Sequence, residues 1–276
     1  MKKTYSPVKR ILEILALLLI TGTFILPFLW MVITSLKTPG ETITFPPVFI
    51  PSEIQLKNFA DAWTSGPFLQ YFKNSIIVTL ATMVLQALFI VPAAYAFAKY
   101  RFAGRDFFFG VVLITLMIPM QLVFIPLYLL FSKFGWINHY ASLIVPFASS
   151  AFGVFMLRQT FMSIPDSILS AARLDNADEW TILRKIMLPI AKPTIITVML
   201  LTFISRWNDY FWPMVMTTQA SMRPLSVGVA NIAQTEGATA WNIVMAGNII
   251  LVAPILILYI IAQKKIINGF VSTEDK

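Results

Sequence analysis

The sequence contains no cysteine and only one histidine, His139. Without cysteine the chain has no disulfide framework and no thiolate metal site. A single histidine leaves little for a metal centre or a histidine-based catalytic set, so neither a metal site nor an enzyme is expected. His139 stands between two apolar runs, where a solvated loop residue is the simplest interpretation.

Charged residues are also scarce. They make up 12% of the 276 residues, about half the share of roughly 25% found in soluble domains. Hydrophobic residues make up 58%, and the mean hydropathy is +0.76. So little polar surface cannot coat a globule in water, which predicts an all-α membrane protein with one transmembrane domain over residues 1–276. Six runs approach or exceed the roughly 18 apolar residues of a transmembrane helix, at residues 11–34, 75–98, 107–131, 141–157, 194–211 and 244–262.

The positive charge is unevenly distributed, although the net charge is +8. If the N-terminus is cytoplasmic and six spans follow, most Lys and Arg residues fall in cytoplasmic segments, as the positive-inside rule requires. We therefore expect both termini in the cytoplasm, outer loops at 37–70 and 217–242, and no nucleic-acid partner. The run 11–34 is too long for the apolar core of a signal peptide and lacks an A-x-A cleavage site, so it is expected to be an uncleaved first span.

A charged, amphipathic segment at residues 163–193 separates the fourth and fifth runs. Pro165 and Asp166 suit the start of one helix, and Asp178 suits the N-cap of a second. Between them Asp175 and Asn176 predict a turn, because Asn tolerates the left-handed conformation. The apolar face of the first helix is expected to carry Ile168, Leu169 and Ala172. Such a helix–turn–helix is either a rigid element that inserts into a groove on a partner, or an amphipathic element lying on the bilayer.

The spacing of small and polar residues in this segment resembles the EAA loop of bacterial ABC importer permeases, written E-A-A-x-x-D-G-A and, about eight residues later, I-x-L-P. In that family the loop docks on the ATPase. The resemblance implies the following ATPase-coupling residues: Ser170, Ala171, Ala172, Arg173, Asp175, Asn176, Ala177, Leu188 and Pro189. Ser170 replaces the usual Glu and Asn176 the usual Gly; Asn can still make the turn.

Other segments resemble carbohydrate-importer permeases of the maltose and glycerol-phosphate types. They are N-F-A-D-A-W at 58–63, A-Y-A-F-A at 94–98, W-N-D-Y-F-W-P at 207–213 and T-E-G-A-T-A-W-N-I-V-M at 235–245. The resemblance implies a six-helix fold in a bacterial cytoplasmic membrane, surrounded by lipid. Its implied partners are a second homologous permease, two ATPase subunits and an extracytoplasmic solute-binding protein. The last outer loop would contact the binding protein through Gly228, Glu236, Gly237 and Trp241.

The chain contains no G-x-x-x-x-G-K-[ST] phosphate loop, so no cofactor is expected in it, and ATP and Mg would be bound by the ATPase. Candidates for the substrate path are Gln121, between two prolines of the third run, and Arg206, Asn208 and Asp209. Gln121 is also compatible with a role in helix packing, and Arg206 with Asp209 as a self-contained i, i+3 pair.

The function that follows from the resemblance is import of sugars or oligosaccharides, driven by ATP in a partner chain. Import of glycerol 3-phosphate or a glycerophosphodiester is the alternative, because the segment at 235–245 is especially similar to glycerol-phosphate-type subunits. An ion-coupled secondary transporter and a non-transporting scaffold are more remote, since charged residues within the spans are few.

Overall fold

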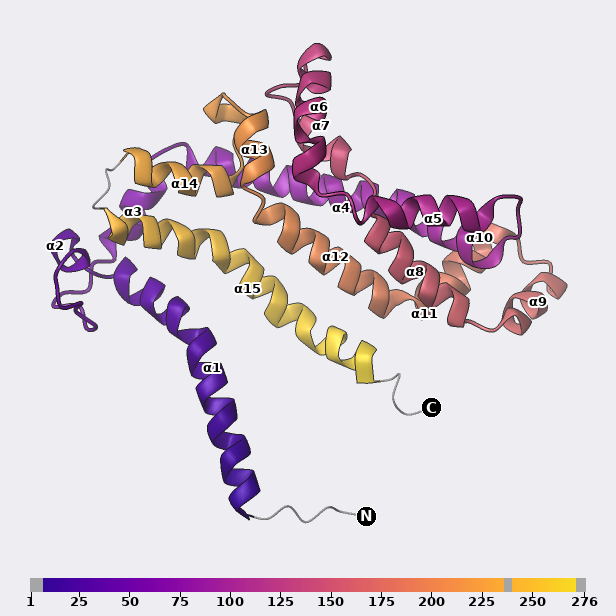
Figure 1. Cartoon of the computed structure of the whole chain (residues 1–276), viewed down its shortest axis with the longest axis horizontal. Coiled ribbons are helices and arrows are strands. Elements are labelled where there is room, and N and C mark those ends of the chain that lie inside the picture. Colours follow the sequence, from indigo (N-terminus) through magenta and orange to yellow (C-terminus); the bar gives the residue numbers. More distant parts are fainter. Residues whose placement is uncertain (1–6, 236–239, 272–276) are drawn as a thin grey trace. The chain divides into compact units, whose positions relative to one another are not determined.

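The computed structural model describes residues 7–235 and 240–271, and within them every regular element is helical. The elements, shown in Figure 1, are α1 (Pro7–Ser35), α2 (Pro39–Thr42), α3 (Lys57–Thr64), α4 (Phe68–Lys99), α5 (Arg105–Thr115), α6 (Met120–Lys133), α7 (Tyr140–Ile144), η1 (Val145–Phe147), α8 (Ala151–Ser163), α9 (Asp166–Leu174), α10 (Glu179–Ile182), the π-helical turn η2 (Leu183–Met187), α11 (Leu188–Ile190), α12 (Lys192–Trp207), α13 (Phe211–Met216), η3 (Ala220–Met222), α14 (Leu225–Thr235) and α15 (Trp241–Val271). The predicted all-α class is confirmed for the described residues.

Within the residues that the structure describes, four helices are long and apolar enough to cross a membrane, and two bent helix pairs bring the number to as many as six. The four coincide with the predicted first, second, fourth and sixth spans, at Ile11–Ser35, Phe68–Lys99, Tyr140–Ser163 and Trp241–Ile261. The first bent pair, Arg105–Thr115 with Met120–Lys133, falls on the predicted third span. In the second pair only α12 falls on the predicted fifth span, because Glu179–Ile190 lies in the charged segment 163–193. The count of six spans therefore stays a prediction.

Each bend has a local cause in the sequence. The axes of α5 and α6 differ by 93°, and Pro119 precedes α6 in an extended conformation with ψ 133°. Proline lacks the N–H that would continue the ladder of helical hydrogen bonds. A bend of 76° separates Glu179–Ile190 from α12, at Ala191 between Pro189 and Pro193. Pro119 predicts a kink, but not a break of 93°. Pro189 and Pro193 predict that the helix ends before the fifth run, and it does.

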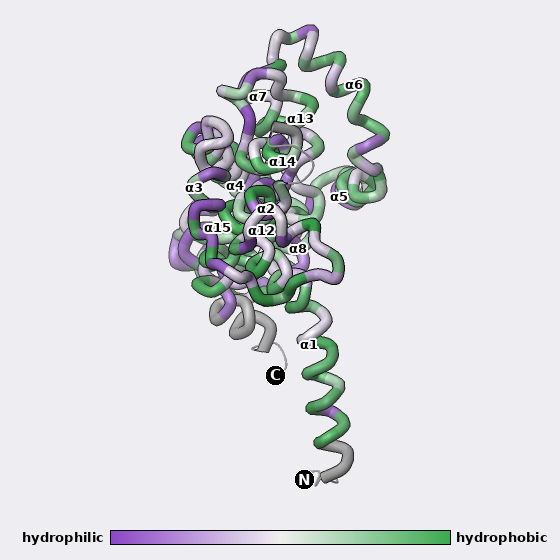
Figure 2. The backbone as a smooth tube through the Cα atoms, turned by 90° about the vertical axis from the view of Figure 1, so that its left-hand side faces the viewer, coloured by the Kyte–Doolittle hydropathy of each residue, from purple (hydrophilic) through white to green (hydrophobic). Residues whose placement is uncertain are grey.

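The chain forms two compact units. The first contains residues 1–68 and 228–254. In it the Asn58 side-chain amide donates to the carbonyls of Ser35 and Lys37, and Asn242 donates to Asn58 at 2.8 Å. Gly247 lies where α14 and α15 meet, and a Cβ there would lie 2.5 Å from Ile232 Cδ1, so the Ile232 side chain would have to move. α1 is apolar along almost its whole length, as Figure 2 shows, and its most apolar window is entirely exposed.

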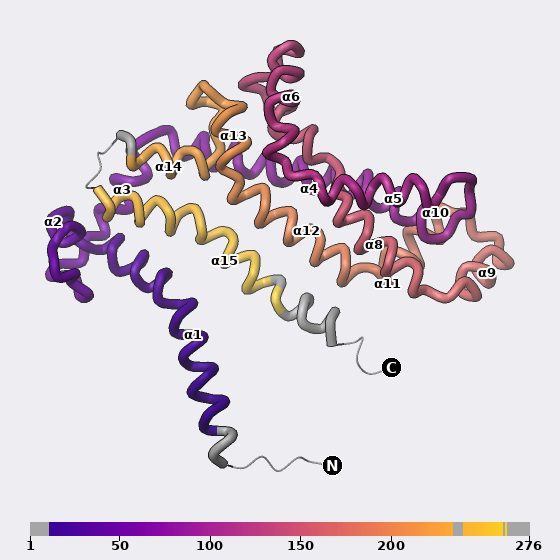
Figure 3. The backbone as a smooth tube through the Cα atoms, in the orientation of Figure 1, coloured from indigo at the N-terminus to yellow at the C-terminus, as the bar shows by residue number. Residues whose placement is uncertain are grey.

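The second unit contains residues 69–227 and 255–276, including the segment 163–193. In it α8 packs against both α5 and α12. α9 and α10 lie where α4 ends, as the backbone trace in Figure 3 shows. The predicted single domain over 1–276 stays a prediction.

Candidate functional site

The segment 163–193, called the coupling segment below, contains two short helices, α9 and α10, joined by a tight turn. Asn176 has φ 59°, the left-handed conformation that the sequence predicts. Its N–H donates to the Arg173 carbonyl, and the Ala177 N–H donates to the Ala172 carbonyl, each at 3.0 Å. These two bonds are those of a Schellman motif, which satisfies the last carbonyls of a helix. Ala172 and Ala177 also pack against the same apolar core, so both alanines have a structural role in the turn.

The second helix begins at its predicted cap. The Asp178 carboxylate accepts a hydrogen bond from the Thr181 N–H at 3.1 Å. The hydrogen bonds from Thr181 hold the pKa of Asp178 below its usual range. A carboxylate at this position satisfies an otherwise free N–H and interacts favourably with the helix dipole. Beyond α10 the chain continues as a π-helical turn, which the sequence does not predict.

One face of the coupling segment is part of the core of the second unit. Leu169, Ile182 and Met187 are each at most 2% exposed and belong to one cluster with Tyr95 and Phe161. Leu169 and Ala172 face the core as predicted. Ile168 was expected beside them but is 41% exposed, because the buried side of α9 is narrower than the predicted apolar face.

The opposite face is exposed, and it includes large apolar side chains. Leu174 is 84% exposed and Trp180 64% exposed. Of the predicted coupling residues, Leu188 is half-buried, whereas the following are exposed: Ser170, Ala171, Arg173, Asp175, Asn176 and Pro189.

Side chains from the C-terminal end of α4 hold both helices of the coupling segment. Lys99 Nζ donates to the Ile164 carbonyl at 2.6 Å and to Asp166 Oδ1 at 2.7 Å. Its side chain is only 5% exposed, whereas that of Asp166 is 84% exposed. The hydrogen bond and charge of Lys99 lower the pKa of Asp166. Tyr95 donates to Glu179 Oε2 at 2.6 Å, and Arg173 pairs with Glu179 Oε1 at 2.9 Å. None of these contacts is predicted by the sequence.

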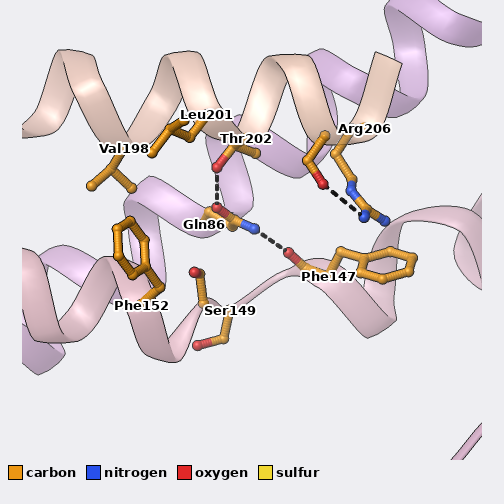
Figure 4. Close-up of a pocket in the computed structure, with 10 residues that line it drawn as sticks. Gln86, Phe147, Ser149, Phe152, Val198, Leu201, Thr202 and Arg206 are labelled. Atoms are coloured by element: carbon orange, nitrogen blue, oxygen red, sulfur yellow. Dashed lines mark hydrogen bonds between the residues drawn. The ribbon is translucent and has the colours of Figure 1, made fainter. Parts of the chain in front are cut away.

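A cavity of about 290 Å³ lies further along α4, between α4, α8, α12 and the segment before α8. Gln86 is at its centre (Figure 4): Thr202 donates to its amide oxygen at 2.7 Å, and its amide nitrogen donates to the Phe147 carbonyl at 2.8 Å. The remaining lining residues are hydroxyl-bearing, apolar or basic: Ser149, Ser150, Phe152, Val198, Leu201, Ser205 and Arg206.

Arg206 and Asp209 form the ion pair that their spacing suggests. Arg206 Nη1 donates to Asp209 Oδ2 at 3.0 Å, and Nη2 donates to Ser205 Oγ at 3.1 Å. The guanidinium lies 3.6 Å from the centre of the Phe147 ring, a cation–π contact. Both side chains are largely buried, at 15% and 17% exposed. The one cation among the cavity's lining residues is therefore already neutralised by a neighbour.

The other predicted path and loop residues are scattered. Gln121 is exposed and does not line this cavity, and Asn208 is exposed at the end of α12. Gly228 is buried and Trp241 is 46% exposed. Glu236 and Gly237 lie outside the described residues. Gln86 and Thr202 were missed, although an amide within an apolar span is a signal that could have found Gln86.

Residues 90–270 match the family model described as "Binding-protein-dependent transport system inner membrane component". The chain belongs to this family. It is therefore a multi-pass membrane component of a transport system, and the resemblance to importer permeases is confirmed. The matched region of this permease contains the whole coupling segment and most of the residues that line the cavity.

Relatives match the permease over nearly its full length. The arabinooligosaccharides transport system permease protein AraQ of Halalkalibacterium halodurans is 33% identical, over 98% of this chain and 97% of that protein. The sn-glycerol-3-phosphate transport system permease protein UgpE of Brucella abortus is 31% identical, over 94% and 95%. A chain from a bacterial ABC transporter that imports the acidic polysaccharide alginate superposes with a TM-score of 0.81 at 28% identity, over 95% and 99%.

Proposed function

We propose that this chain is the membrane-spanning subunit of an ATP-driven importer of sugars or oligosaccharides. It crosses a bacterial cytoplasmic membrane six times, at the six predicted runs, with the coupling segment and both termini in the cytoplasm. The complete importer contains a second homologous permease, two ATPase subunits and an external solute-binding protein. ATP and Mg²⁺ are bound by the ATPase subunits, and this chain needs no cofactor. The family's dependence on binding proteins supports the external partner.

The observation that carries the proposal is the two-sided coupling segment. Its inner face is buried with the core, while its outer face presents Leu174 and Trp180 at 84% and 64% exposure. An exposed apolar patch with a polar rim is typical of a protein interaction surface. We assign this face to the ATPase, through the exposed residues of the EAA-like loop. Closure of the ATPase dimer moves this segment as a unit and tips the helices between inward-open and outward-open states.

The outer end of the chain is assigned to the binding protein. Trp241 is 46% exposed at the start of α15, in the loop predicted to receive that partner. Gly228 is buried, so it acts by shaping the backbone and not by direct contact. Docking of the loaded binding protein releases the solute to the permease, and ATP hydrolysis returns the helices to the inward-open state.

The lining of the cavity favours a neutral sugar over a phosphate. It offers an amide, several hydroxyls and the rings of Phe147 and Phe152, which suit the hydroxyls and C–H faces of a sugar. An anion would need a positive charge that is free to pair with it, and Arg206 is already paired with Asp209. The AraQ relative supports the same class. Glycerol 3-phosphate remains the second candidate because of the UgpE relatives.

The experiment is to measure ATP hydrolysis by the reconstituted importer, with its binding protein, across neutral oligosaccharides, uronate oligosaccharides and glycerol 3-phosphate. We expect neutral oligosaccharides to stimulate hydrolysis, and the ATPase subunits alone to show no response. If glycerol 3-phosphate alone stimulated hydrolysis, the proposed substrate would be glycerol 3-phosphate and not a sugar. Uptake that persists without the ATPase would contradict the whole proposal.

A further inference from the structure

Two of the links between the coupling segment and the rest of the second unit differ in kind, besides its packing against α8 and α12 in the same apolar cluster. Its covalent link to α12 passes through a π-helical turn, Ala191 and a bend of 76°. Its non-covalent link to α4 consists of the contacts of Tyr95 and Lys99. These two residues are four apart, so they lie on one face of α4. Each contacts the first residue of a different helix: Asp166 begins α9 and Glu179 begins α10.

The link to α4 also includes buried apolar side chains. Ala94 and Tyr95 belong to the same buried cluster as Leu169, Ile182 and Met187. Lys99 is nearly as buried, although one of its acceptors is exposed. Charge-assisted hydrogen bonds next to a packed core hold geometry better than isolated surface pairs do. The end of α4 and the coupling segment are therefore joined by hydrogen bonds and by a shared apolar core.

The same helix reaches the cavity. Gln86 precedes Tyr95 by nine residues and Lys99 by thirteen, which at 1.5 Å per residue is roughly 14 to 20 Å along the axis. Its amide joins α4 to Thr202 of α12 and to the Phe147 carbonyl. One continuous helix thus contacts the coupling segment at one end and the walls of the cavity at the other.

We propose that α4 transmits movement between the coupling segment and the cavity, with Lys99 and Tyr95 as the positioning residues that attach it. The proposal rests on the proposed function, because it takes the coupling segment to be the docking site of the ATPase. It assigns the mechanical connection to a helix that is distant in sequence from the segment, and not to α12, which follows the segment directly.

The test compares K99M and Y95F with K99R and with R105M in the reconstituted importer. Arg105 pairs with the adjacent Asp106, so R105M removes a cation of the same region without touching the coupling segment. Three quantities are measured: co-purification of the ATPase, basal hydrolysis, and stimulation of hydrolysis by loaded binding protein. K99M is expected to co-purify with the ATPase and to show normal basal hydrolysis. Its stimulation by loaded binding protein is expected to fall roughly tenfold, the scale of a lost hydrogen bond to a charged group. In Y95F the stimulation of hydrolysis is expected to fall by less than in K99M. In K99R and R105M it is expected to be normal.

The outcomes separate the two proposals. If the ATPase does not co-purify with the unaltered chain, the proposed function fails. If it does, and K99M stimulates normally, the transmission by α4 is wrong while the function stands. Loss of ATPase binding in K99M would make Lys99 part of assembly, which also overturns the inference.

A double-mutant cycle gives a second, independent measurement. Q86L removes the bonds from α4 to Thr202 and Phe147 without touching the coupling segment. If both residues act through α4, the losses of stimulation in K99M and Q86L combine less than multiplicatively in the double variant. Independent, fully multiplicative losses would show that the two ends of α4 are not coupled.

Discussion

The coupling segment at one end of α4 and the cavity further along it differ in the charge of their polar contacts. At the coupling segment, Lys99 and Arg173 bind acidic partners whose side chains are 84% and 44% exposed, so full charges meet where water is close. The cavity is lined mainly by neutral groups, including an amide and several hydroxyls, and its one basic lining residue, Arg206, is paired with Asp209. Charged, geometrically strict contacts suit an element that must hold its position. Neutral contacts suit a passage from which a solute must also leave, because none of them is strong.

The largest expected effect tests the two faces of the coupling segment. Leu169→Asp places a charge in a core position that is 2% exposed, and an unpaired buried charge costs several kcal/mol. The segment should lose both its resistance to proteolysis and its binding of the ATPase. Leu174→Asp, at a position 84% exposed, should remain resistant to proteolysis but lose ATPase binding.

That pair of variants has a clear contrary result. If L174D binds the ATPase as well as the unaltered chain does, the outer face is not the docking surface. If L169D remains resistant to proteolysis, the inner face is not part of the core that holds the segment.

Local structure in this chain follows from local sequence, while its long-range contacts do not. The left-handed turn at Asn176 and the cap at Asp178 were predictable, because each depends on residues within five positions. Lys99 and Asp166 are 67 residues apart, and nothing in their neighbourhoods specifies that they meet. The same holds for Tyr95 and Glu179, 84 residues apart.

In the spans, too, local features were predictable and features that depend on distant residues were not. Apolar composition located the four long helices, because length and hydropathy are additive properties of a run. The bend of 93° before α6 depends on how α5 and α6 pack with their neighbours, and Pro119 alone fixes only where it occurs. At the cavity, the Arg206–Asp209 pair was predictable because the two residues are three apart. The contacts of Gln86 were not, because its partners lie 61 and 116 residues away.

An intermediate effect is expected when the neutral character of the cavity is changed. Asp209→Asn keeps the shape of the side chain but leaves Arg206 without its counter-charge. Stimulation of ATP hydrolysis by anionic solutes relative to neutral ones should rise, by roughly tenfold for an exchanged interaction of about 1.4 kcal/mol. Ser205→Ala is the matched control, since it removes a neutral partner of Arg206 and keeps the charges balanced. An unchanged ratio in D209N would make the pair a structural feature of the helix end only.

The smallest effect is expected from Asp166→Asn, although Asp166 pairs with the same lysine whose loss should be severe. Its side chain is 84% exposed, and exposed ion pairs contribute little to stability. In D166N, Lys99 also keeps its hydrogen bond to the Ile164 carbonyl. Stimulation of ATP hydrolysis in D166N should therefore fall less than roughly twofold.

The pH dependence of this contact follows from the direction of the pKa shift. Lys99 lowers the pKa of Asp166 below 3.8, so the pair's contribution is complete above that value and is lost only as the pH falls through the lower, folded pKa. Coupling through this contact should thus be constant from about pH 6 to 8, in both the unaltered chain and D166N. A loss in D166N as large as in K99M would mean that the exposed carboxylate, and not the buried bond to the Ile164 carbonyl, holds α9 to α4.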